Sequence, residues 1–396
     1  MTPLERRSTF SLATLFALRM LGLFLVLPVF ALEAARYPGG DDPAAVGLAM
    51  GVYGLTQALL QIPFGLASDR LGRKRVILFG LLLFAAGSFV AAAAQTLDAL
   101  LLGRALQGAG AISAAVTALL ADQTRDVVRT KAMALVGASI GLMFALSLLL
   151  APVLAELIGL NGMFAATGAL ALTGMALVIW WVPAEPGVGG DASRGSLLAV
   201  LRNPALLRLD LGVFVLHAVQ LAMWVAVPAL LVQAGLGKQE HWSIYLPAVL
   251  GSFVLMGVVF PLERRGFLRA VFLVAIGLIA VVQLGLWLVA PAPTVMALGV
   301  LLFVFFGGFN VLEATQPSLV SRLAPGHSRG AALGVYNTLQ SLGFFAGGAL
   351  GGWLAKHLGP QGLFAVCGGA MLLWLLVAWP MTAPGRHAPT VPVQAA

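Results

Sequence analysis

The chain has 396 residues, of which 60% are hydrophobic and only 10% are charged. A soluble domain carries roughly 25% charged residues, so this composition excludes an ordinary water-soluble protein and indicates a polytopic membrane protein. The formal net charge of +8 comes from residues spread over short polar segments, which argues against nucleic-acid binding, and the single cysteine, Cys367, excludes an internal disulfide and a cysteine metal cluster.

Apolar runs of about 20 residues recur along the chain, and each is long enough to cross the hydrocarbon layer as a helix. The first is expected to be a span rather than a signal peptide, because no small-residue cleavage site precedes Glu33. The pattern predicts an all-α membrane protein with twelve transmembrane helices. These are placed at 12–34, 45–67, 76–95, 99–121, 131–157, 162–183, 206–233, 243–262, 268–290, 294–319, 330–355 and 361–381.

The only long polar break predicts the domain organisation. Residues 184–204 hold Pro186, three nearby glycines and several charges, which is typical of a linker. We therefore expect an N-terminal six-helix bundle over 1–183, a cytoplasmic linker over 184–204, and a C-terminal six-helix bundle with a short cytoplasmic tail over 205–396.

The basic residues predict orientation. With a cytoplasmic N-terminus, most of the 23 Lys and Arg fall on the cytoplasmic side, Arg19 and Arg104 lie inside spans, and only Arg36, Lys238 and Lys356 fall outside. This asymmetry follows the positive-inside rule. Both termini are therefore expected in the cytoplasm.

An internal repeat links the two halves. The first loop, "GLASDRLGRKRV" at 65–76, aligns with "PLERRGFLRA" at 261–270, so that Glu263 matches Asp69 and Gly266 matches Gly72. Other pairs keep a constant offset of 200 residues: Pro28, Arg129, Ala132, Leu142, Phe144, Gly159, Gly162, Phe164 and Gly168 match Pro228, Arg329, Ala332, Leu342, Phe344, Gly359, Gly362, Phe364 and Gly368. Two parallel repeats imply a pseudo-twofold axis along the membrane normal, with a site between the halves at the midplane.

Two motifs carry a family resemblance. "GLASDRLGRK" resembles the loop 2–3 signature of the major facilitator superfamily, and "RALQGAG" at 104–110 resembles its span 4 signature. The stretches "ALRMLGLFLVLPVF", "GVYGLTQALLQIPFGLASDR" and "FNVLEATQPSL" resemble the YajR branch of the twelve-span drug:proton antiporters. Two departures stand out: "LLAPVLAE" lacks the Gly-Pro of the antiporter span 5 signature, and the chain is expected to lack the extra C-terminal domain of that branch. The resemblance implies a central cavity lined by spans 1, 4, 7 and 10.

Four ionisable residues within spans are candidates for proton coupling, because such groups are costly in hydrocarbon and usually face a cavity or a partner. Glu313 is the leading proton carrier, since a cation that approaches a carboxyl group in a low-dielectric cavity can expel its proton. The alternative is a permanent salt bridge with Arg19. Arg104 is a candidate for controlling a nearby carboxylate, a role that the resemblance also implies, or for capping carbonyl groups. Glu33 is either its ion-pair partner or a solvated residue at the helix mouth.

Neutral polar residues recur at helical spacing on several spans, so each set forms one stripe. They form either a pocket for an amphipathic ligand or hydrogen-bonded contacts between helices. His217 is also a possible proton site. The predicted substrate-binding residues are Tyr53, Gln57, Gln61, Gln107, His217, Gln220, Trp224, Asn310, Gln316, Asn337 and Gln340.

The charged loop also predicts a conformational latch. The family fold would bring Asp69 to the N-terminus of the span that begins near Arg329, and a carboxylate at a helix N-terminus is stabilised. This contact is possible only when the cytoplasmic side is shut. The predicted latch residues are Gly65, Asp69, Arg70, Gly72, Arg73, Lys74, Glu263 and Arg264.

The sequence has no Walker loop, metal-ligand cluster or nucleophile elbow, so neither an enzyme nor a cofactor or metal site is expected. We expect a secondary active transporter of a bacterial inner membrane that exports small amphipathic molecules by proton-coupled alternating access. The alternatives are a proton symporter or facilitator for a nutrient, and a membrane sensor or scaffold that transports nothing. The expected partners are a small-molecule substrate, protons and membrane lipid, with no nucleic acid, and the chain is expected to be a monomer.

Overall fold

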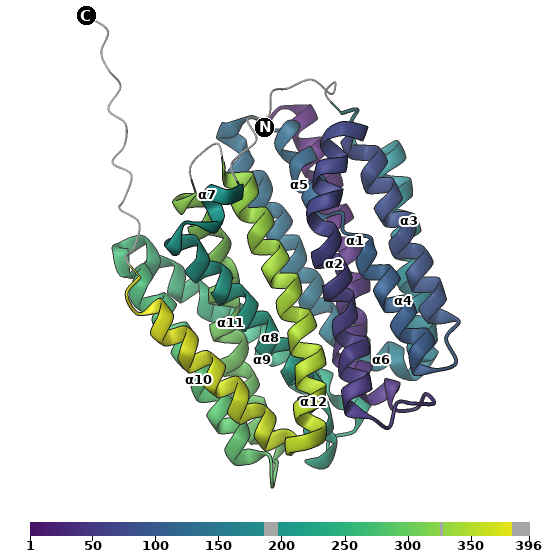
Figure 1. Ribbon diagram of the computed structural model, residues 1–396, viewed down its shortest axis with the longest axis vertical. Coiled ribbons are helices and arrows are strands. Elements are labelled where there is room, and N and C mark those ends of the chain that lie inside the picture. Colours follow the sequence, from purple (N-terminus) through teal and green to yellow (C-terminus); the bar gives the residue numbers. More distant parts are fainter. Residues whose placement is uncertain (186–196, 325–327, 382–396) are drawn as a thin grey trace, which may run out of the picture.

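All regular secondary structure in the described residues is helical, which confirms the all-α prediction. We examined a computed structural model, which describes residues 1–185, 197–324 and 328–381 (Figure 1). The helices are α1 (Pro3–Ala34), α2 (Pro43–Leu71), α3 (Arg73–Ala92), α4 (Leu97–Ala109), α5 (Ser113–Asp122), α6 (Asp126–Trp180), α7 (Leu197–Leu201), α8 (Pro204–Gln233), α9 (Trp242–Leu262), α10 (Leu268–Val289), α11 (Val295–Leu323) and α12 (Arg329–Ala378), with short turns η1 (Lys238–Glu240) and η2 (Glu263–Phe267).

Side-chain caps fix where the long helices begin. Thr2 and Glu5 form a capping box at the start of α1, and Asp42 and Asn203 accept hydrogen bonds from the first backbone N–H groups of α2 and α8. A proline follows each of these caps, where its missing N–H costs nothing. Short polar residues between apolar runs therefore set the boundaries of these helices.

The two longest helices each contain a break at the same place in the repeat. Gly159 in α6 has φ 64° and ψ 178°, and Gly359 in α12 has φ 66° and ψ −178°. These angles are open almost only to glycine. Two glycines 200 positions apart thus share one unusual conformation, in agreement with the predicted internal repeat.

The number of membrane spans stays a prediction. Among the described residues, nine helical segments are long and apolar enough to cross a membrane. Two of these are α6 and α12, and α9 is not among them. Dividing α6 and α12 at Gly159 and Gly359 and adding α9 would give the twelve predicted spans.

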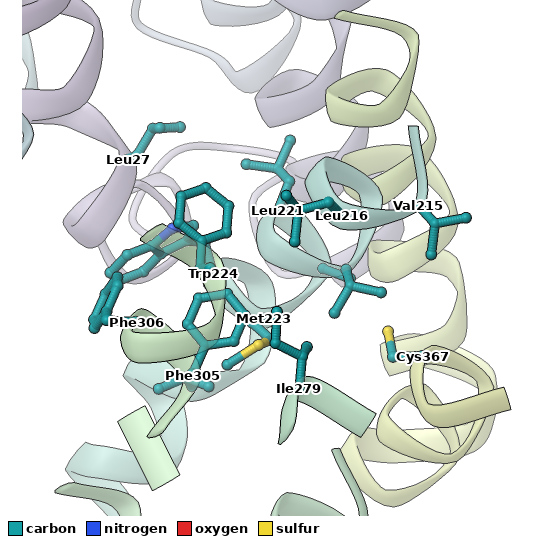
Figure 2. Close-up of a cluster of buried hydrophobic side chains, with 14 of the residues drawn as sticks. Leu27, Val215, Leu216, Leu221, Met223, Trp224, Ile279, Phe305, Phe306 and Cys367 are labelled. Atoms are coloured by element: carbon teal, nitrogen blue, oxygen red, sulfur yellow. The ribbon is translucent and has the colours of Figure 1, made fainter. Parts of the chain in front are cut away.

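Two groups of helices lie side by side in Figure 1, α1 to α6 in purple to blue and α8 to α12 in teal to yellow. Within the first group α6 packs against α1 and α3, and within the second α12 packs against α8 and α10. Bulky side chains from α1, α8, α10 and α11 meet in a shared apolar core, where Leu27, Trp224, Ile279 and Phe306 are buried (Figure 2).

The halves meet most closely where α2 packs against α12. A Cβ added at Gly47 would lie 2.3 Å from the carbonyl oxygen of Gly348, and one at Gly51 would lie 2.7 Å from that of Phe345. Only glycines allow this approach of two backbones. Nearer the start of α12, a Cβ added at Gly330 or Gly334 would have nothing within 4 Å. The contact between α2 and α12 is thus closest around Gly47 and Gly348.

Ion pairs strengthen the closely packed end, which is the predicted outer end. Lys356 of α12 lies 2.7 Å from Asp42 before α2, and Lys238 of the C-terminal half lies 3.5 Å from Glu33 of α1. The cation beside Asp42 lowers the pKa of that carboxyl group below 3.8, so the Lys356 pair persists at neutral pH.

Candidate functional site

Three polar side chains from three helices of the C-terminal half meet in one cluster. Oε2 of Glu313 on α11 lies 3.3 Å from Nε2 of His217 on α8. The amide nitrogen of Gln340 on α12 lies 2.8 Å from the same histidine nitrogen and donates a 3.2 Å hydrogen bond to Oε1 of Glu313. An acid, a base and an amide therefore share one hydrogen-bonded arrangement.

His217 is held rigidly within this cluster. Its Nδ1 lies 2.9 Å from the carbonyl oxygen of Val213, one turn earlier on α8, and its ring makes edge contacts with Phe309 and Phe344. A carbonyl only accepts, so Nδ1 carries a proton and Nε2 is free to accept one. Only 2% of the His217 side chain is exposed, against 38% for Glu313. Glu313 is therefore far more accessible to solvent than His217.

Arg19 is buried near the middle of the N-terminal half. It donates hydrogen bonds to Oγ of Ser113 at 2.8 Å, to the Tyr53 hydroxyl at 3.1 Å and to the carbonyl oxygen of Gly110 at 3.2 Å. That carbonyl is available because the helix of the fourth predicted span breaks between Ala109 and Ser113. The alternative of a permanent Glu313–Arg19 salt bridge is wrong for this conformation, since Glu313 pairs with His217 instead.

Arg104 is also buried, at 2% exposure. It donates to Oε1 of Gln107 at 3.0 Å and to the carbonyl oxygen of Met50 at 3.4 Å, and its guanidinium group lies 5.0 Å from the centre of the Tyr53 ring. Gln107 in turn donates to Ser88. The cation is thus held by amides, a carbonyl and an aromatic face, and the prediction that it caps a neighbouring carbonyl matches the contact with Met50.

Glu33 lies away from Arg104. Its carboxylate is 2.7 Å from Arg36 and 3.5 Å from Lys238, both at the predicted outer end. The expected Glu33–Arg104 ion pair is therefore wrong for this conformation. The buried cations Arg19 and Arg104 form no ion pair with a described carboxylate. The two acids expected to pair with them, Glu313 and Glu33, pair with other residues.

A family model described as Major Facilitator Superfamily matches residues 12–348 and, in a second match, residues 269–395. The chain belongs to the Major Facilitator Superfamily. It is 45% identical over 393 residues to "Inner membrane transport protein YajR" of Escherichia coli (strain K12), a match that covers 97% of this chain and 85% of that protein. It is therefore a membrane transporter of this superfamily.

Two further likenesses are more distant. The chain is 29% identical over 355 residues to "Multidrug resistance protein MdtH" of Aeromonas salmonicida (strain A449), which covers 87% of this chain and 86% of the relative. The crystal structure of the human organic anion transporter MFSD10 (TETRAN) matches with a TM-score of 0.71 at 19% identity, over 95% of this chain and all of that one. The structural match shows the superfamily fold.

The superfamily loop between α2 and α3 has a network of its own. Asp69 pairs with Arg73, whose Nε also lies 3.1 Å from Asp122, while Glu185 accepts hydrogen bonds from the backbone N–H groups of Arg73 and Lys74. Gly72 ends α2 with φ 97°, and the repeat partner Gly266 has φ 103°. The side chains of Glu263 and Arg264 lie outside the described residues, so the latch stays a prediction.

The predicted substrate-binding residues fall into different environments. Gln57 donates a 3.0 Å hydrogen bond to Ser341 across the two halves, and Asn310 donates to Ser252 at 2.7 Å. Trp224 packs in the apolar core against the ring of Tyr245. Of the predicted substrate-binding residues, three buried glutamines have amide atoms without a hydrogen-bond partner in the described part of the chain: Gln61, Gln220 and Gln316. A substrate role for all of these residues stays a prediction.

Asp210 is the acidic residue that the sequence analysis missed. It lies on α8 with 4% of its surface exposed, and neither carboxylate oxygen has a hydrogen-bond partner among the described residues. A signal was present, because Asp210 falls within the predicted span 206–233. Its position near the end of that span concealed it, since charges at span ends are ordinary.

Proposed function

We propose that this superfamily member exports small amphipathic molecules across the bacterial inner membrane in exchange for protons, by alternating access. The observation that carries the proposal is the contact between the partly exposed Glu313 and the buried His217, bridged by Gln340. A carboxyl group on the transport route exchanges protons with water, and a basic nitrogen beside it responds to its charge. The proposal also keeps the predictions that both termini lie in the cytoplasm and that the transporter acts as a monomer.

The proton step needs only groups in this cluster. When Glu313 is protonated, its Oε2–H donates to Nε2 of neutral His217. When Glu313 is ionised, its proton has passed to water, and the Gln340 amide still donates to its Oε1 atom. A cationic substrate that approaches Glu313 stabilises its ionised form and releases its proton, so binding of substrate and proton exclude each other. That exclusion is the coupling that an antiporter requires.

Alternating access follows from the contacts between the halves. The closely packed α2 and α12 backbones and the Asp42–Lys356 pair join the halves at the predicted outer end. The open space beside Gly334 lies at the predicted cytoplasmic end, which supports an inward-facing conformation. Rocking of one half against the other would break the outer contacts and form the predicted Asp69 contact at the opposite end.

The proposed substrate class rests on the chemistry around the cluster. Phe309 and Phe344 supply aromatic faces, Gln340 and Asn310 supply amides, and Glu313 supplies the negative charge. Such a lining suits an amphipathic ligand with an aromatic body and a positive group. One relative carries the name of a multidrug resistance protein, in agreement with this class.

Proteoliposomes distinguish this proposal from its alternatives. The purified protein is reconstituted with a pH-sensitive dye inside, and lipophilic aromatic cations are added outside. Exchange predicts that entry of the cation along its gradient drives protons out of the lumen, so that the interior becomes alkaline. Acidification of the lumen with substrate entry would indicate a proton symporter, substrate entry with no proton movement a facilitator, and no entry of any substrate a sensor or scaffold.

A further inference from the structure

A second carboxyl group, Asp210, lies within the predicted span 206–233 and has no hydrogen-bond or ion-pair partner among the described residues. It is six residues into α8, roughly 9 Å along the helix from Pro204. Only 4% of its surface is exposed, its neighbours Leu209 and Val213 are buried, and neither Oδ atom accepts a hydrogen bond from a described residue. No described cation pairs with it. Arg208 is two residues away on the same helix and therefore points in another direction.

An unpaired carboxylate in this position is costly. Removing an isolated charge from water costs far more than removing the neutral acid, and buried groups of this kind take up a proton instead. Ionisable residues within membrane spans are expected to serve a function rather than the fold. Asp210 therefore carries a proton in this conformation.

Two buried polar atoms of α12, which packs against α8, also lack hydrogen-bond partners in the described part of the chain. The hydroxyl of Tyr336 and the indole Nε1 of Trp374, both on α12, are buried and lack hydrogen-bond partners among the described residues. A Cβ added at Gly212 would lie 2.7 Å from Nε1 of Trp374, so the indole packs against α8 on a different face from Asp210, which is two residues away. Unmatched polar atoms from two helices indicate a site that changes its hydrogen bonding during function.

Helical spacing places Asp210 directly below the Glu313 cluster. Asp210 and His217 are seven residues apart on α8, and Tyr336 and Gln340 are four apart on α12, so each pair shares one face of its helix. The groups thus form two layers, His217 with Gln340 and Glu313 in one, and Asp210 with Tyr336 in the other.

We propose that Asp210 is a second proton-carrying carboxyl group, coupled to Glu313 through Tyr336; the inference rests on the proposed role of Glu313. The net step moves one proton. The O–H bond of Asp210 breaks as the proton passes to the Tyr336 oxygen, and the Tyr336 proton passes to the carboxylate of Glu313. Asp210 is left ionised, Glu313 neutral and Tyr336 unchanged. Ionisation of either acid makes ionisation of the other harder, so the two titrate as a pair.

Infrared difference spectroscopy of the full chain in lipid nanodiscs tests the inference directly. The carbonyl stretch of a protonated carboxylic acid reports Asp210 without any transport measurement. We expect the unaltered protein to show such a band at neutral pH, Asp210→Asn to lose it, and Asp98→Asn, which changes an exposed acid of α4, to keep it. A band that is unchanged in Asp210→Asn overturns the inference.

Two further variants separate a proton role from a structural one. Glu313→Gln should shift the pH at which the Asp210 band disappears, because it removes the coupled charge. Tyr336→Phe, which removes only the hydroxyl, should keep the band but slow proton-driven transport about tenfold while substrate exchange continues. If neither effect occurs, Asp210 does not communicate with Glu313 and the inference is overturned.

Proton stoichiometry links the inference to transport. Asp210→Asn should lower the number of protons exchanged for each substrate by about half and leave its thermal midpoint unchanged or raised. If Asp210→Asn changes neither the number of protons exchanged for each substrate nor the carboxylic-acid band, the proposed role of Asp210 is overturned. That result leaves the proposed proton coupling by Glu313 intact. Absence of any proton exchange in the unaltered protein overturns the proposed function, and with it the inference that rests on it.

Discussion

Oε2 of Glu313 lies 3.3 Å from Nε2 of His217, and the amide of Gln340 contacts both groups. One member of this pair is 38% exposed and the other is 2% exposed. This difference in exposure matters because a group that exchanges protons, such as Glu313, needs access to water. A group that stabilises one of its charge states, such as His217, must be held rigidly beside it. In the proposed function, the exposed Glu313 exchanges the proton and the buried His217 responds to its charge.

Single-cysteine labelling tests the predicted orientation. In a Cys367→Ala background, Val127→Cys should react only with a membrane-impermeant reagent on the cytoplasmic side, and Asp41→Cys only with one outside. Both positions are exposed, and Val127 is 94% exposed. Ser328 is a poor labelling site because it is fully buried, and Gly39 is a poor one because its φ of 88° disfavours a side chain. Reaction of Asp41→Cys from the cytoplasmic side alone would reverse the topology.

The α2–α12 contact predicts a way to hold the protein in its other conformation. A Cβ at Gly348 would lie 2.6 Å from the carbonyl oxygen of Gly47, and backbone cannot move aside as a flexible side chain can. Gly348→Val should therefore cost about 1–3 kcal/mol in the outer-closed conformation. The ratio of conformations should shift by roughly 5- to 150-fold.

Spin labels at Asp41 and His357, which lie on opposite halves at the predicted outer end, measure this shift as a longer distance. Gly334→Val is the matched control, since it places the same side chain on α12 where a Cβ has nothing within 4 Å. Equal distance distributions for the two variants would show that the glycine contact does not set the conformational equilibrium.

The Asp69 latch predicts a change in access from the cytoplasm. Asp69→Asn should remove about 0.3–2 kcal/mol from the outward-facing conformation, because it removes the carboxylate that faces a helix N-terminus. A cysteine at Gly334 should then react faster with a cytoplasmic reagent, and transport should slow without loss of thermal stability. Asp122→Asn is the control, since Asp122 also binds Arg73 but lies outside the motif. Normal transport and an unchanged labelling rate in Asp69→Asn would rule out the latch.

His241 predicts a pH dependence of stability. It lies just before α9, outside the spans, and burial lowers its pKa from 6.5 to about 4. Between these values the unfolded state binds the proton and the folded state does not, so stability falls as the pH drops from 6.5 to 4 and levels off below. The loss is on the order of 1–2 kcal/mol after allowance for solvent screening.

Thermal unfolding in detergent at several pH values measures this effect in the unaltered protein and in His241→Gln. The carboxylates contribute equally to both proteins, so the difference between their unfolding midpoints reports His241. The difference between the two midpoints should change across pH 6.5 to 4. A constant difference would mean that His241 keeps its ordinary pKa in the folded protein.

Local sequence signals predict much of the fold. Apolar runs of span length locate the helices, Thr2, Asp42 and Asn203 mark where three of them begin, and Gly159 with Gly359 marks the repeated break. These features depend on neighbouring residues and on glycine itself, so they are visible in one sequence. The contact between Gly47 and Gly348 cannot be predicted from the sequence in this way, because it depends on how two helices from different halves are tilted and rotated.

The same distinction holds for the site. Glu313, Arg19 and Arg104 stand out as charges within apolar runs, but their partners come from other helices. Glu313 lies beside His217 rather than Arg19, and Arg19 binds a carbonyl freed by the break before Ser113. Asp210 looked like an ordinary residue near a span end until packing showed it buried. Helix rotation, which spacing alone does not determine, decided each of these outcomes.

Proton-driven transport by Glu313→Gln is the most direct test of the account. In proteoliposomes with an imposed pH gradient, the variant should bind substrate and exchange it without a gradient, because the amide mimics the protonated carboxyl group. It should fail to accumulate substrate against its gradient, whereas the exposed-site control Glu156→Gln should accumulate it normally. If Glu313→Gln still accumulates substrate when a proton gradient drives it, Glu313 is not the proton carrier and the central claim is wrong.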